Sequence, residues 1–220
     1  MATDELEIGP ARRDELPAVA RLHHRWFGPG NELEVEGASL ALLGAGFLAD
    51  AFYGANLDNP HFGVHVARCG GRIVAFNCFV SDRDRIGRHA ILHHLPRLVW
   101  ATLRAVAKHP AAVVHLIRNL QYVRGERAPW IEPRDAQWLV FTVEPEFRSK
   151  EYAERTGRRV AAEMFAAMED ELRRRGCPGW YGTVWVSNGP MTRFMERAGA
   201  RVIGKATAQG HLVNYWRRTL

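Results

Sequence analysis

The chain has 220 residues, enough for one domain with a sizeable hydrophobic core. Hydrophobic residues make up 47% and charged residues 25% of the sequence, which is typical of a folded globular protein and excludes a disordered or collagen-like chain. Thirty Lys and Arg against 24 Asp and Glu give a formal net charge of +6. The whole excess lies within residues 85–125, which hold no acid and these basic residues: Arg85, Arg88, Arg97, Arg104, Lys108, Arg118 and Arg124.

Three cysteines, Cys69, Cys78 and Cys177, are too few and too scattered for a disulfide framework or a zinc cluster. We therefore expect three small core side chains and no metal site. Residues 1–7 lack the basic start and apolar stretch of a signal peptide, and the sequence has no run of 18 apolar residues. These features predict a cytoplasmic protein.

The first part of the chain predicts an α+β domain that opens with a strand, two helices and a hairpin. Apolar spacing and turn residues define these elements. They are, in chain order, a strand at Leu6–Gly9, a helix capped by Asp14, an amphipathic helix over Leu40–Tyr53, and strands at His61–Arg68 and Ile73–Val80 joined by a turn at Gly70 and Gly71.

The basic segment predicts a helical hairpin inserted between strands. Its first helix places an apolar stripe on one face, made by Leu92, Leu95, Val99, Leu103 and Val106. The opposite face carries His93, Arg97, Arg104 and Lys108. Pro110 starts the second helix, whose inward residues are Val113, Leu116, Ile117, Leu120 and Val123. We expect this pair to pack on the sheet through its apolar stripes and to leave a solvated basic face.

The fold resumes after the insertion with a buried central strand, because an apolar run lies between Pro133 and Pro145. The predicted elements are a strand at Trp138–Val143, a long helix over Lys150–Arg175, a strand at Trp180–Val186, a short helix from Asn188 to Arg197, and final strands at Val202–Ile203 and His211–Arg218. No repeat or linker interrupts the chain, so we expect one domain over residues 1–220 with one insertion over residues 85–125.

Three stretches carry a family resemblance. Leu6–Val19 has the character of an opening strand and helix, Val143–Ala153 is similar to a V-x-P-x-x-R-x-x-G-x-G/A signature, and Asn188–Ala200 is similar to N-x-x-A-x-x-x-Y-x-x-x-G-F. In these stretches the chain resembles the GNAT superfamily of acyl-CoA-dependent N-acyltransferases. The resemblance implies a GNAT fold, a mixed central sheet of six or seven strands flanked by helices. It covers all but the inserted hairpin.

The resemblance also implies a site for acetyl-CoA or another acyl-CoA as co-substrate. A strand that turns directly into a helix presents free backbone N–H groups, which form an anion site. In the family this loop holds the pyrophosphate of coenzyme A, and the end of the strand binds pantetheine. By position in the family pattern, pantetheine would bind to the backbone of Phe141, Thr142 and Val143. Pyrophosphate would bind to the loop of Arg148, Ser149, Lys150, Glu151, Tyr152 and Ala153. Asn188 contacts pantetheine or caps its helix.

Two positions depart from the family pattern. Glu151 replaces the first glycine of the signature and places a negative charge where phosphate oxygens would lie. An alternative alignment starts the signature at Arg155 and restores a glycine at Gly157, but it leaves seven extra residues after Pro145. Met195 stands where many members have a tyrosine that protonates the departing thiolate, and methionine cannot donate a proton.

The resemblance implies transfer of an acyl group to the amine of a small molecule. Glu144 and Glu132 are the candidate general bases, with Asp135 and His65 as further candidates, although each also fits a structural role. Three alternatives stay open: an acyl carrier protein as the donor, a catalytically silent pantetheine-binding module, and an interaction module at a membrane surface.

The basic residues of the insertion are not interleaved with stacking aromatics, so nucleic acid is a disfavoured partner. An acidic protein such as an acyl carrier protein remains a candidate partner for this segment. The oligomeric state is open, a homodimer included.

Overall fold

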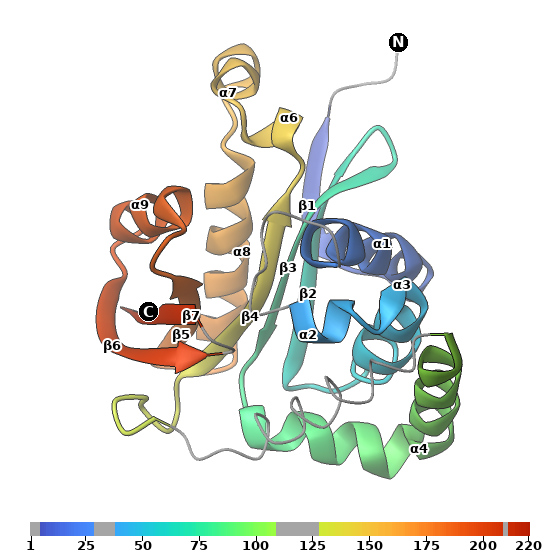
Figure 1. Ribbon diagram of the computed structural model, residues 1–220. Coiled ribbons are helices and arrows are strands. Elements are labelled where there is room, and N and C mark those ends of the chain that lie inside the picture. The colour runs from blue at the N-terminus through green and yellow to red at the C-terminus, as the bar shows by residue number, and fades with distance from the viewer. Residues whose placement is uncertain (1–4, 29–37, 109–127, 209–210) are drawn as a thin grey trace.

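Seven strands form one mixed sheet in the computed structural model, which describes residues 5–28, 38–108, 128–208 and 211–220 (Figure 1). The strand order is β1-β2-β3-β4-β5-β7-β6, and every neighbouring pair is antiparallel except β4 and β5. The strands are β1 (Leu6–Pro10), β2 (Phe62–Cys69), β3 (Arg72–Val80), β4 (Ala136–Val143), β5 (Gly179–Trp185), β6 (Arg201–Ala208) and β7 (His211–Thr219). The predicted mixed sheet of six or seven strands is thereby confirmed.

Helices cover both faces of the sheet. One face packs against α1 (Leu16–Phe27), α2 (Ala38–Ala41), α3 (Gly44–Phe47) and the π-helical turn η2 (Leu48–Tyr53). The other face packs against α8 (Val160–Arg174) and α9 (Gly189–Arg197). The short helices α6 (Pro145–Arg148) and α7 (Lys150–Thr156) connect β4 to α8. Two hydrophobic cores result, one under each layer of helices.

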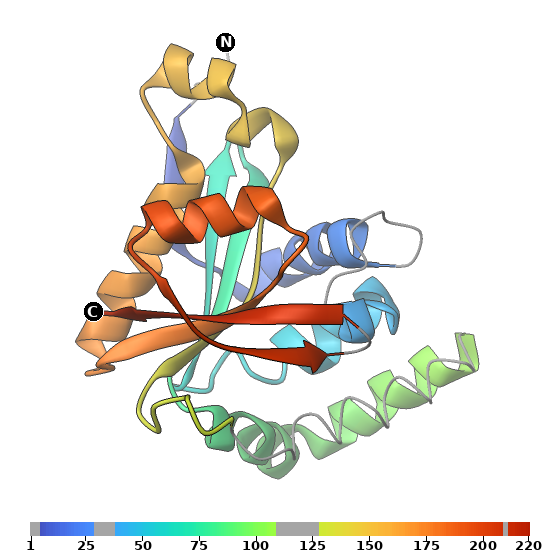
Figure 2. The same cartoon turned by 60° about the vertical axis from the view of Figure 1, so that its left-hand side comes forward.

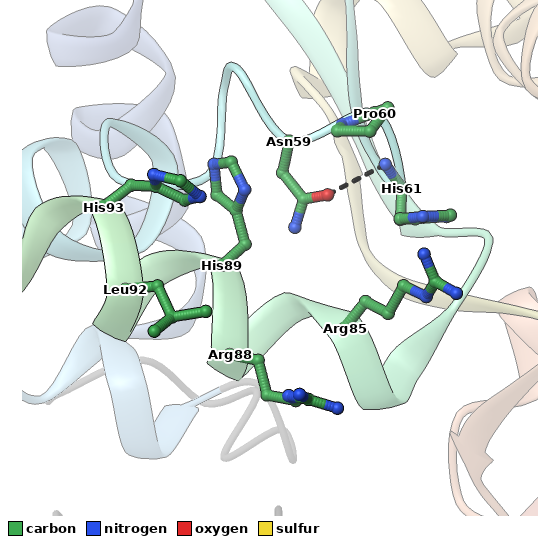
Figure 3. A pocket seen from close by; sticks show the side chains of 8 residues that line it. All are labelled: Asn59, Pro60, His61, Arg85, Arg88, His89, Leu92 and His93. Carbon is green, nitrogen blue, oxygen red and sulfur yellow. Dashed lines mark hydrogen bonds between the residues drawn. The ribbon is translucent and has the colours of Figure 1, made fainter.

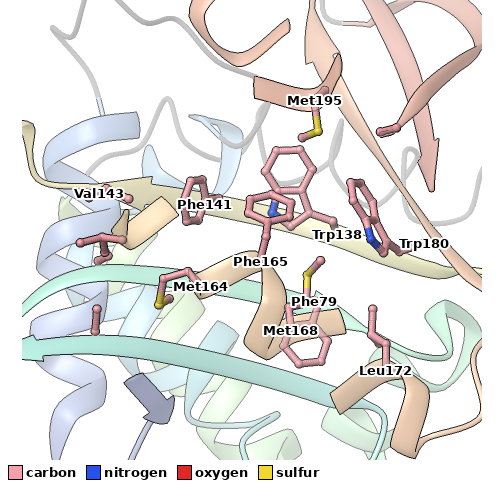
Figure 4. Close-up of a cluster of buried hydrophobic side chains, with 14 of the residues drawn as sticks. Phe79, Trp138, Phe141, Val143, Met164, Phe165, Met168, Leu172, Trp180 and Met195 are labelled. Atoms are coloured by element: carbon pink, nitrogen blue, oxygen red, sulfur yellow. The ribbon is translucent and has the colours of Figure 1, made fainter. Parts of the chain in front are cut away.

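The core beneath α8 is rich in aromatic rings. Trp138 on β4, Phe165 on α8 and Trp180 on β5 lie within 5.3 to 6.3 Å of one another, measured between ring centroids (Figure 4). Large rings bury much apolar surface, so they supply a major part of the driving force for packing this layer. Of the predicted core cysteines, Cys78 is buried, while Cys69 and Cys177 are half-buried.

The predicted hairpin between β2 and β3 is present. Gly70 and Gly71 have φ angles of 56° and 77°, a conformation that side chains disfavour and glycine adopts freely. The turn therefore sets the register in which Cys69 pairs with Arg72. Figure 1 shows this hairpin beside β1 at the same end of the sheet as α6 and α7.

The first helix starts later than predicted, and Asp14 does not cap it. A 3-10 turn, η1 (Arg13–Glu15), comes first, and α1 begins at Leu16 with Pro17 in its first turn. Proline has no backbone N–H to donate, so it fits the first turn of a helix, where those groups have no partner.

Two predicted helices are interrupted at glycines. The segment Leu40–Tyr53 contains a break at Gly44, which has a φ of 86°, and the predicted long helix Lys150–Arg175 ends its first part at Gly157, which has a φ of 69°. A residue with positive φ cannot continue a right-handed helix and commonly ends one. The helix that packs on the sheet is therefore α8, which begins at Val160.

The segment predicted as a basic insertion starts with α4 (Arg83–Lys108), which consists of two helical segments joined by a kink and runs along the edge of the molecule (Figure 2). Its backbone departs from helical geometry at His94, two residues before Pro96, because proline lacks the N–H of a helical hydrogen bond and crowds the preceding turn. The rest of the predicted hairpin, residues 109–127, lies outside the described residues. No helix in the described part of the chain is both long and apolar enough to span a membrane.

The predicted orientation of this helix is wrong. The stripe expected to face inward is exposed by 73% at Leu92, 52% at Leu95, 48% at Val99 and 58% at Leu103. The helix contacts α3 and η2 instead, and small residues, Ala101 and Ala105, are buried there. Arg97, expected on the solvated face, reaches Asp50 at 3.3 Å. Alanines allow two helices to approach closely, and this contact leaves the large apolar side chains on the outside.

Candidate active site

The two parallel strands of the sheet separate toward their carboxyl ends. β4 and β5 pair only at Ala136 with Trp180 and at Gln137 with Tyr181. Figure 2 shows β7 and β6 running across the direction of β2 and β3, as a sheet that opens between β4 and β5 requires. Beyond Gln137, within the described residues, β4 has no strand partner on this side. Its free N–H and C=O groups can pair with amides of an extended ligand.

An irregularity in β4 lies at this opening. Phe79 of β3 pairs with Trp138, and the next residue, Cys78, pairs with Val140. Leu139 is therefore an extra residue that bulges from the ladder, and bulges redirect the backbone beside them. On the β3 side the pairing continues to Val143, so the strand stays anchored while its other edge is free.

The amino end of α8 supplies a potential anion site. The backbone N–H groups of Val160, Ala161 and Ala162 have no partner inside the helix because they occupy its first turn. Such a terminus carries a partial positive charge and favours phosphate. Arg158 is held in place by Glu163, whose carboxylate lies 3.1 Å from the Arg158 Nε atom.

Aromatic rings fill the space between α8 and α9. The ring centroids of Phe165 and Phe194 are 4.9 Å apart, and Phe141 of β4 stacks on Phe194 at 6.4 Å. Gly182 of β5 lies under Trp138 so closely that a Cβ atom there would come within 2.3 Å of the indole ring. Met195, at the position of the family tyrosine, is fully buried in the same core (Figure 4).

The predicted pantetheine residues lie on the free stretch of β4. Phe141, Thr142 and Val143 are all at most 9% exposed, and Phe141 and Val143 belong to the core under α8. Asn188 caps α9, since its side-chain oxygen accepts a hydrogen bond from the Met191 backbone N–H at 3.1 Å. The capping interpretation of Asn188 is thereby confirmed, and its amide nitrogen points away from that bond.

The predicted pyrophosphate loop forms α6 and α7 instead of the start of the helix on the sheet. Arg148 stacks over the Trp26 ring at 5.4 Å, Ser149 caps α7 by accepting from the Tyr152 N–H at 3.1 Å, and Tyr152 is buried against Phe147. Lys150 pairs with Glu154 at 3.1 Å, Glu151 is exposed, and Ala153 is half-buried. The structure brings Gly157, from the alternative alignment, to the turn just before α8.

The two candidate bases lie at opposite ends of β4. Glu132 is exposed in the turn before the strand, and Glu144 is buried directly after it. The Glu144 carboxylate accepts hydrogen bonds from Arg25 at 2.6 Å and from the Trp26 indole at 3.3 Å. It lies at the edge of a cavity of about 550 Å³ between α1 and the β2–β3 turn.

The further candidates have structural partners or buried surroundings. The Asp135 carboxylate binds the Arg217 guanidinium at 2.5 and 3.2 Å. His65 is 6% exposed, its ring lies 5.3 Å from that of Phe79, and burial lowers its pKa to about 4. A buried neutral imidazole on the α8 face of β2 is a core residue in this arrangement.

Comparison with known proteins identifies the fold. No protein-family profile and no curated protein sequence matches the chain. Solved structures do match over nearly the whole chain. An N-acetyltransferase from Staphylococcus aureus Mu50 has a TM-score of 0.61 at 13% identity, and the protein SsHAT has 0.65 at 17%, each covering 98% of both chains. YncA from Salmonella typhimurium, solved with its cofactor acetyl-CoA, has 0.54 at 12%, covering 98% of this chain and 94% of its own.

These neighbours show that the chain has the fold of the GNAT acetyltransferases, as its sequence predicts. The likeness at this identity concerns the fold. The assignment of an activity to this chain depends on its own residues.

Proposed function

We propose that the protein is an N-acyltransferase that moves an acetyl or other acyl group from coenzyme A to the amine of a small molecule. The observation that carries the proposal is the free edge of β4 beyond Gln137, followed along the chain by the amino end of α8. A ligand with amide groups at one end and phosphates at the other matches these two features. The neighbour YncA was solved with acetyl-CoA, which supports the proposal.

The phosphates of coenzyme A fit the turn of Gly157 and the first turn of α8, which corresponds to the alternative alignment of the signature. Arg155 and Arg159 flank this turn and are exposed, so they can neutralise phosphate charge. Glu151 lies in the first turn of α7, away from this turn in the chain, and the like-charge conflict that its position predicted does not arise there.

The pantetheine arm would lie along β4, where Phe141, Thr142 and Val143 offer backbone groups. The rings of Phe165 and Phe194 meet between α8 and α9, so we expect Phe194, which is only partly buried, to change rotamer when the arm enters. The free amide nitrogen of Asn188 is available as a donor to the arm without loss of the helix cap.

In the reaction the amine nitrogen attacks the thioester carbonyl carbon and forms a C–N bond. The negative charge that develops on the carbonyl oxygen is stabilised by backbone N–H groups of β4. The C–S bond then breaks, coenzyme A leaves as a thiolate, and the amine proton passes to a base or to water. Met195 cannot protonate the thiolate, so water does so, which removes a contribution typically worth about 10²- to 10⁴-fold in rate.

Two exposed alanines in α8 provide a test. Ala162 lies in the first turn, and Ala166 lies one turn later on the same side of the helix. Ala162→Glu adds an acid that favours helix formation there and should repel pyrophosphate. We expect it to raise the Kd of acetyl-CoA about tenfold or more in calorimetry, while Ala166→Glu changes it less than about threefold.

Pantetheine, which lacks the phosphates, should bind both variants alike. Acetyl-CoA, longer acyl-CoAs and an acylated carrier protein are compared as donors with a panel of amines, and turnover is followed by thiol release. If no donor binds the wild-type protein, the proposed function is wrong. Binding without turnover of any amine would support the silent pantetheine-binding module.

A second candidate function, docking on an anionic membrane surface, is favoured by α4. Four large apolar residues after the kink of α4 are exposed by 48 to 62%: Leu95, Val99, Trp100 and Leu103. Basic residues flank these side chains, and Arg104 lies over the Trp100 ring at 5.5 Å. An amphipathic helix of this composition binds the interface of anionic bilayers.

Co-sedimentation with vesicles of phosphatidylcholine, with and without phosphatidylglycerol, tests this candidate. The double variant Trp100→Gln/Leu103→Gln should lose vesicle binding, and a matched pair on β6, Val202→Gln with Arg201→Gln, should keep it. Absence of binding by the wild-type protein to either vesicle would contradict the candidate function and would leave the transferase proposal unaffected.

A further inference from the structure

A second cavity lies at the end of the sheet remote from α8's amino end. Its volume is about 460 Å³. Its walls come from the turn before β2 and from the first turns of α4 (Figure 3), and the lining residues are Asn59, Pro60, His61, Arg85, Arg88, His89, Leu92 and His93. β2 begins and β3 ends beside it, where Phe62 pairs with Val80, whereas Val143 pairs with Ala75 near the other end of β3. The cavity is therefore separate from the proposed phosphate site.

Asn59 places an unpaired hydrogen-bond donor in this cavity. The residue is 2% exposed, and its side-chain oxygen accepts a hydrogen bond from the His61 backbone N–H at 2.9 Å. That bond fixes the orientation of the amide, so the nitrogen faces the other way. Figure 3 shows this nitrogen pointing into the space between His89 and Arg85, and it has no partner within the described residues. A buried donor without an acceptor is costly unless a ligand supplies one.

His89 adds a second unpaired nitrogen. Its Nε2 atom is buried and has no hydrogen-bond partner among the described residues. Its ring lies 4.7 Å from that of His93, and Figure 3 shows both rings extending from α4 toward Asn59. The described part of the chain contains no group of three His, Cys, Asp or Glu residues placed to hold a metal ion. The His89 Nε2 atom can donate a hydrogen bond to a ligand when it carries the ring proton.

The charge around the cavity is positive. None of its lining residues is an acid. Arg85 is paired with Asp82 at 3.2 Å, and the nearby Asp58 is paired with Arg13. Arg88 lies at the rim and has no carboxylate partner in the described parts of the chain. Pro60 and Leu92 contribute apolar wall, so the cavity combines donors and positive charge with hydrocarbon surface.

We propose that this cavity binds a small organic oxyanion, a carboxylate or a phosphate monoester on an apolar body. The oxyanion accepts hydrogen bonds from the Asn59 amide and His89 and is attracted by Arg88, while the body of the ligand packs on Leu92 and Pro60. The two unpaired nitrogens that face this cavity, Asn59 Nδ2 and His89 Nε2, then each have an acceptor. This site is independent of the proposed transferase reaction, and it recognises an anionic group rather than a thioester.

Benzoate and phenyl phosphate are the probes, and benzamide is the uncharged control. Binding is measured by calorimetry and by changes in the NMR signals of the histidine rings. We expect saturable binding of at least one anion, with shifts at His89 and His93, and binding of benzamide at least about tenfold weaker, because a hydrogen bond to a charged group is stronger than one to a neutral group. Preference for one anion identifies which oxyanion the cavity takes.

Asn59→Asp is the decisive variant. The carboxylate keeps the acceptor for the His61 N–H and replaces the inward donor by a negative oxygen, so the fold is retained and anion binding should fall about tenfold or more. Arg88→Gln, at an exposed position, should also weaken binding, and Arg104→Gln on the same helix but outside the cavity should leave the Kd within about twofold.

Thermal unfolding of each variant verifies that it is folded. Failure of both anions to shift the histidine signals would overturn the proposal. So would equal binding of benzamide, or equal losses in Arg88→Gln and Arg104→Gln, which would indicate non-specific attraction to the basic helix.

Discussion

A buried ion pair at the start of the fold makes stability depend on acidity. The Glu15 carboxylate accepts hydrogen bonds from the Arg68 guanidinium of β2 at 2.6 and 2.8 Å, and from the Arg12 backbone N–H at 2.7 Å. Arg68 also donates to the Pro10 carbonyl at 2.7 Å, so the pair ties β1 and the entry to α1 to the sheet. Its hydrogen bonds to Arg68 lower the pKa of Glu15 from 4.5 to about 2.

The lowered pKa converts into a free energy. A carboxyl group whose pKa falls by this amount on folding contributes about 3 kcal/mol to the free energy of unfolding above pH 4.5. The unfolded chain takes up the proton first as the pH falls, so the contribution declines on acidification. About 2 kcal/mol of it is lost by pH 3, and nearly all of it below pH 2.

Glu15→Gln removes this dependence. We expect the variant to be less stable than wild type by about 3 kcal/mol at pH 7 and by about 1 kcal/mol at pH 3, measured by urea unfolding across this range. Glu146→Gln, which removes an exposed pair with Arg72, is the control and should change stability by no more than about 1 kcal/mol at either pH. A wild-type-to-Glu15→Gln difference that stays constant from pH 7 to pH 3 would refute the reasoning.

Three further predictions concern single positions. Gly182→Ala should lower the free energy of unfolding by about 1–3 kcal/mol, because the new Cβ would meet the Trp138 ring at 2.3 Å. Gly157→Ala has free space around it and should cost only the strain of its positive φ, about 1 kcal/mol. Thermal unfolding compares the two variants, and equal losses would contradict the packing argument. His65 should titrate near pH 4 in NMR because burial disfavours its charged form, so its protonation destabilises the fold on acidification; a midpoint near 6.5 would show an exposed ring. Asn188→Asp should keep the α9 cap and the melting temperature but weaken acetyl-CoA binding. Asn188→Ala should weaken binding and also lose about 1 kcal/mol of stability. Unchanged affinity in Asn188→Asp would show that the residue only caps the helix.

Local patterns were sufficient for β2, β3 and α9, whereas the predicted strand Val202–Ile203 covers only a small part of β6, Arg201–Ala208. Runs of apolar residues on either side of the Gly70–Gly71 turn predict β2 and β3 nearly to the residue, because a tight turn sets where the two strands end and begin. The cap and proline of Asn188–Pro190 likewise mark the start of α9. The hairpin turn and the α9 cap are each defined by residues close together in the sequence, so they can be predicted without knowledge of tertiary contacts.

The orientation of α4 was predicted wrongly because it depends on packing between segments that are distant in the chain. The apolar face of α4 has the periodicity of a buried helix, but α3 and η2 accept its alanines instead, and this choice depends on neighbours distant in the chain. The break at Gly157 has a local signal, since a glycine inside a helical pattern marks a potential end.

The cavity beside α4 was missed as a site because its residues come from two separate segments. His89 and His93 are four residues apart on one helix and visible as a pair in the sequence. Asn59, whose side-chain nitrogen is the unpaired donor in the cavity, lies 30 residues earlier, and its sequence surroundings indicate a polar turn. Burial of its amide is a tertiary property that no pattern reveals.

Only two residue pairs join β4 to β5, so this seam divides the sheet into one part with β1–β4 and another with β5–β7. β5, β6 and β7 lie within residues 179–219, so their ladders close short loops, and formation of this unit costs little chain entropy. Beyond these two pairs, side chains pack across the seam, such as the Trp138 ring of β4, whose centroid lies 6.3 Å from that of Trp180 of β5. Backbone amides along the seam should therefore exchange with solvent sooner than those of β2 and β3, and a ligand that bridges β4 and β5 should slow that exchange in both halves together.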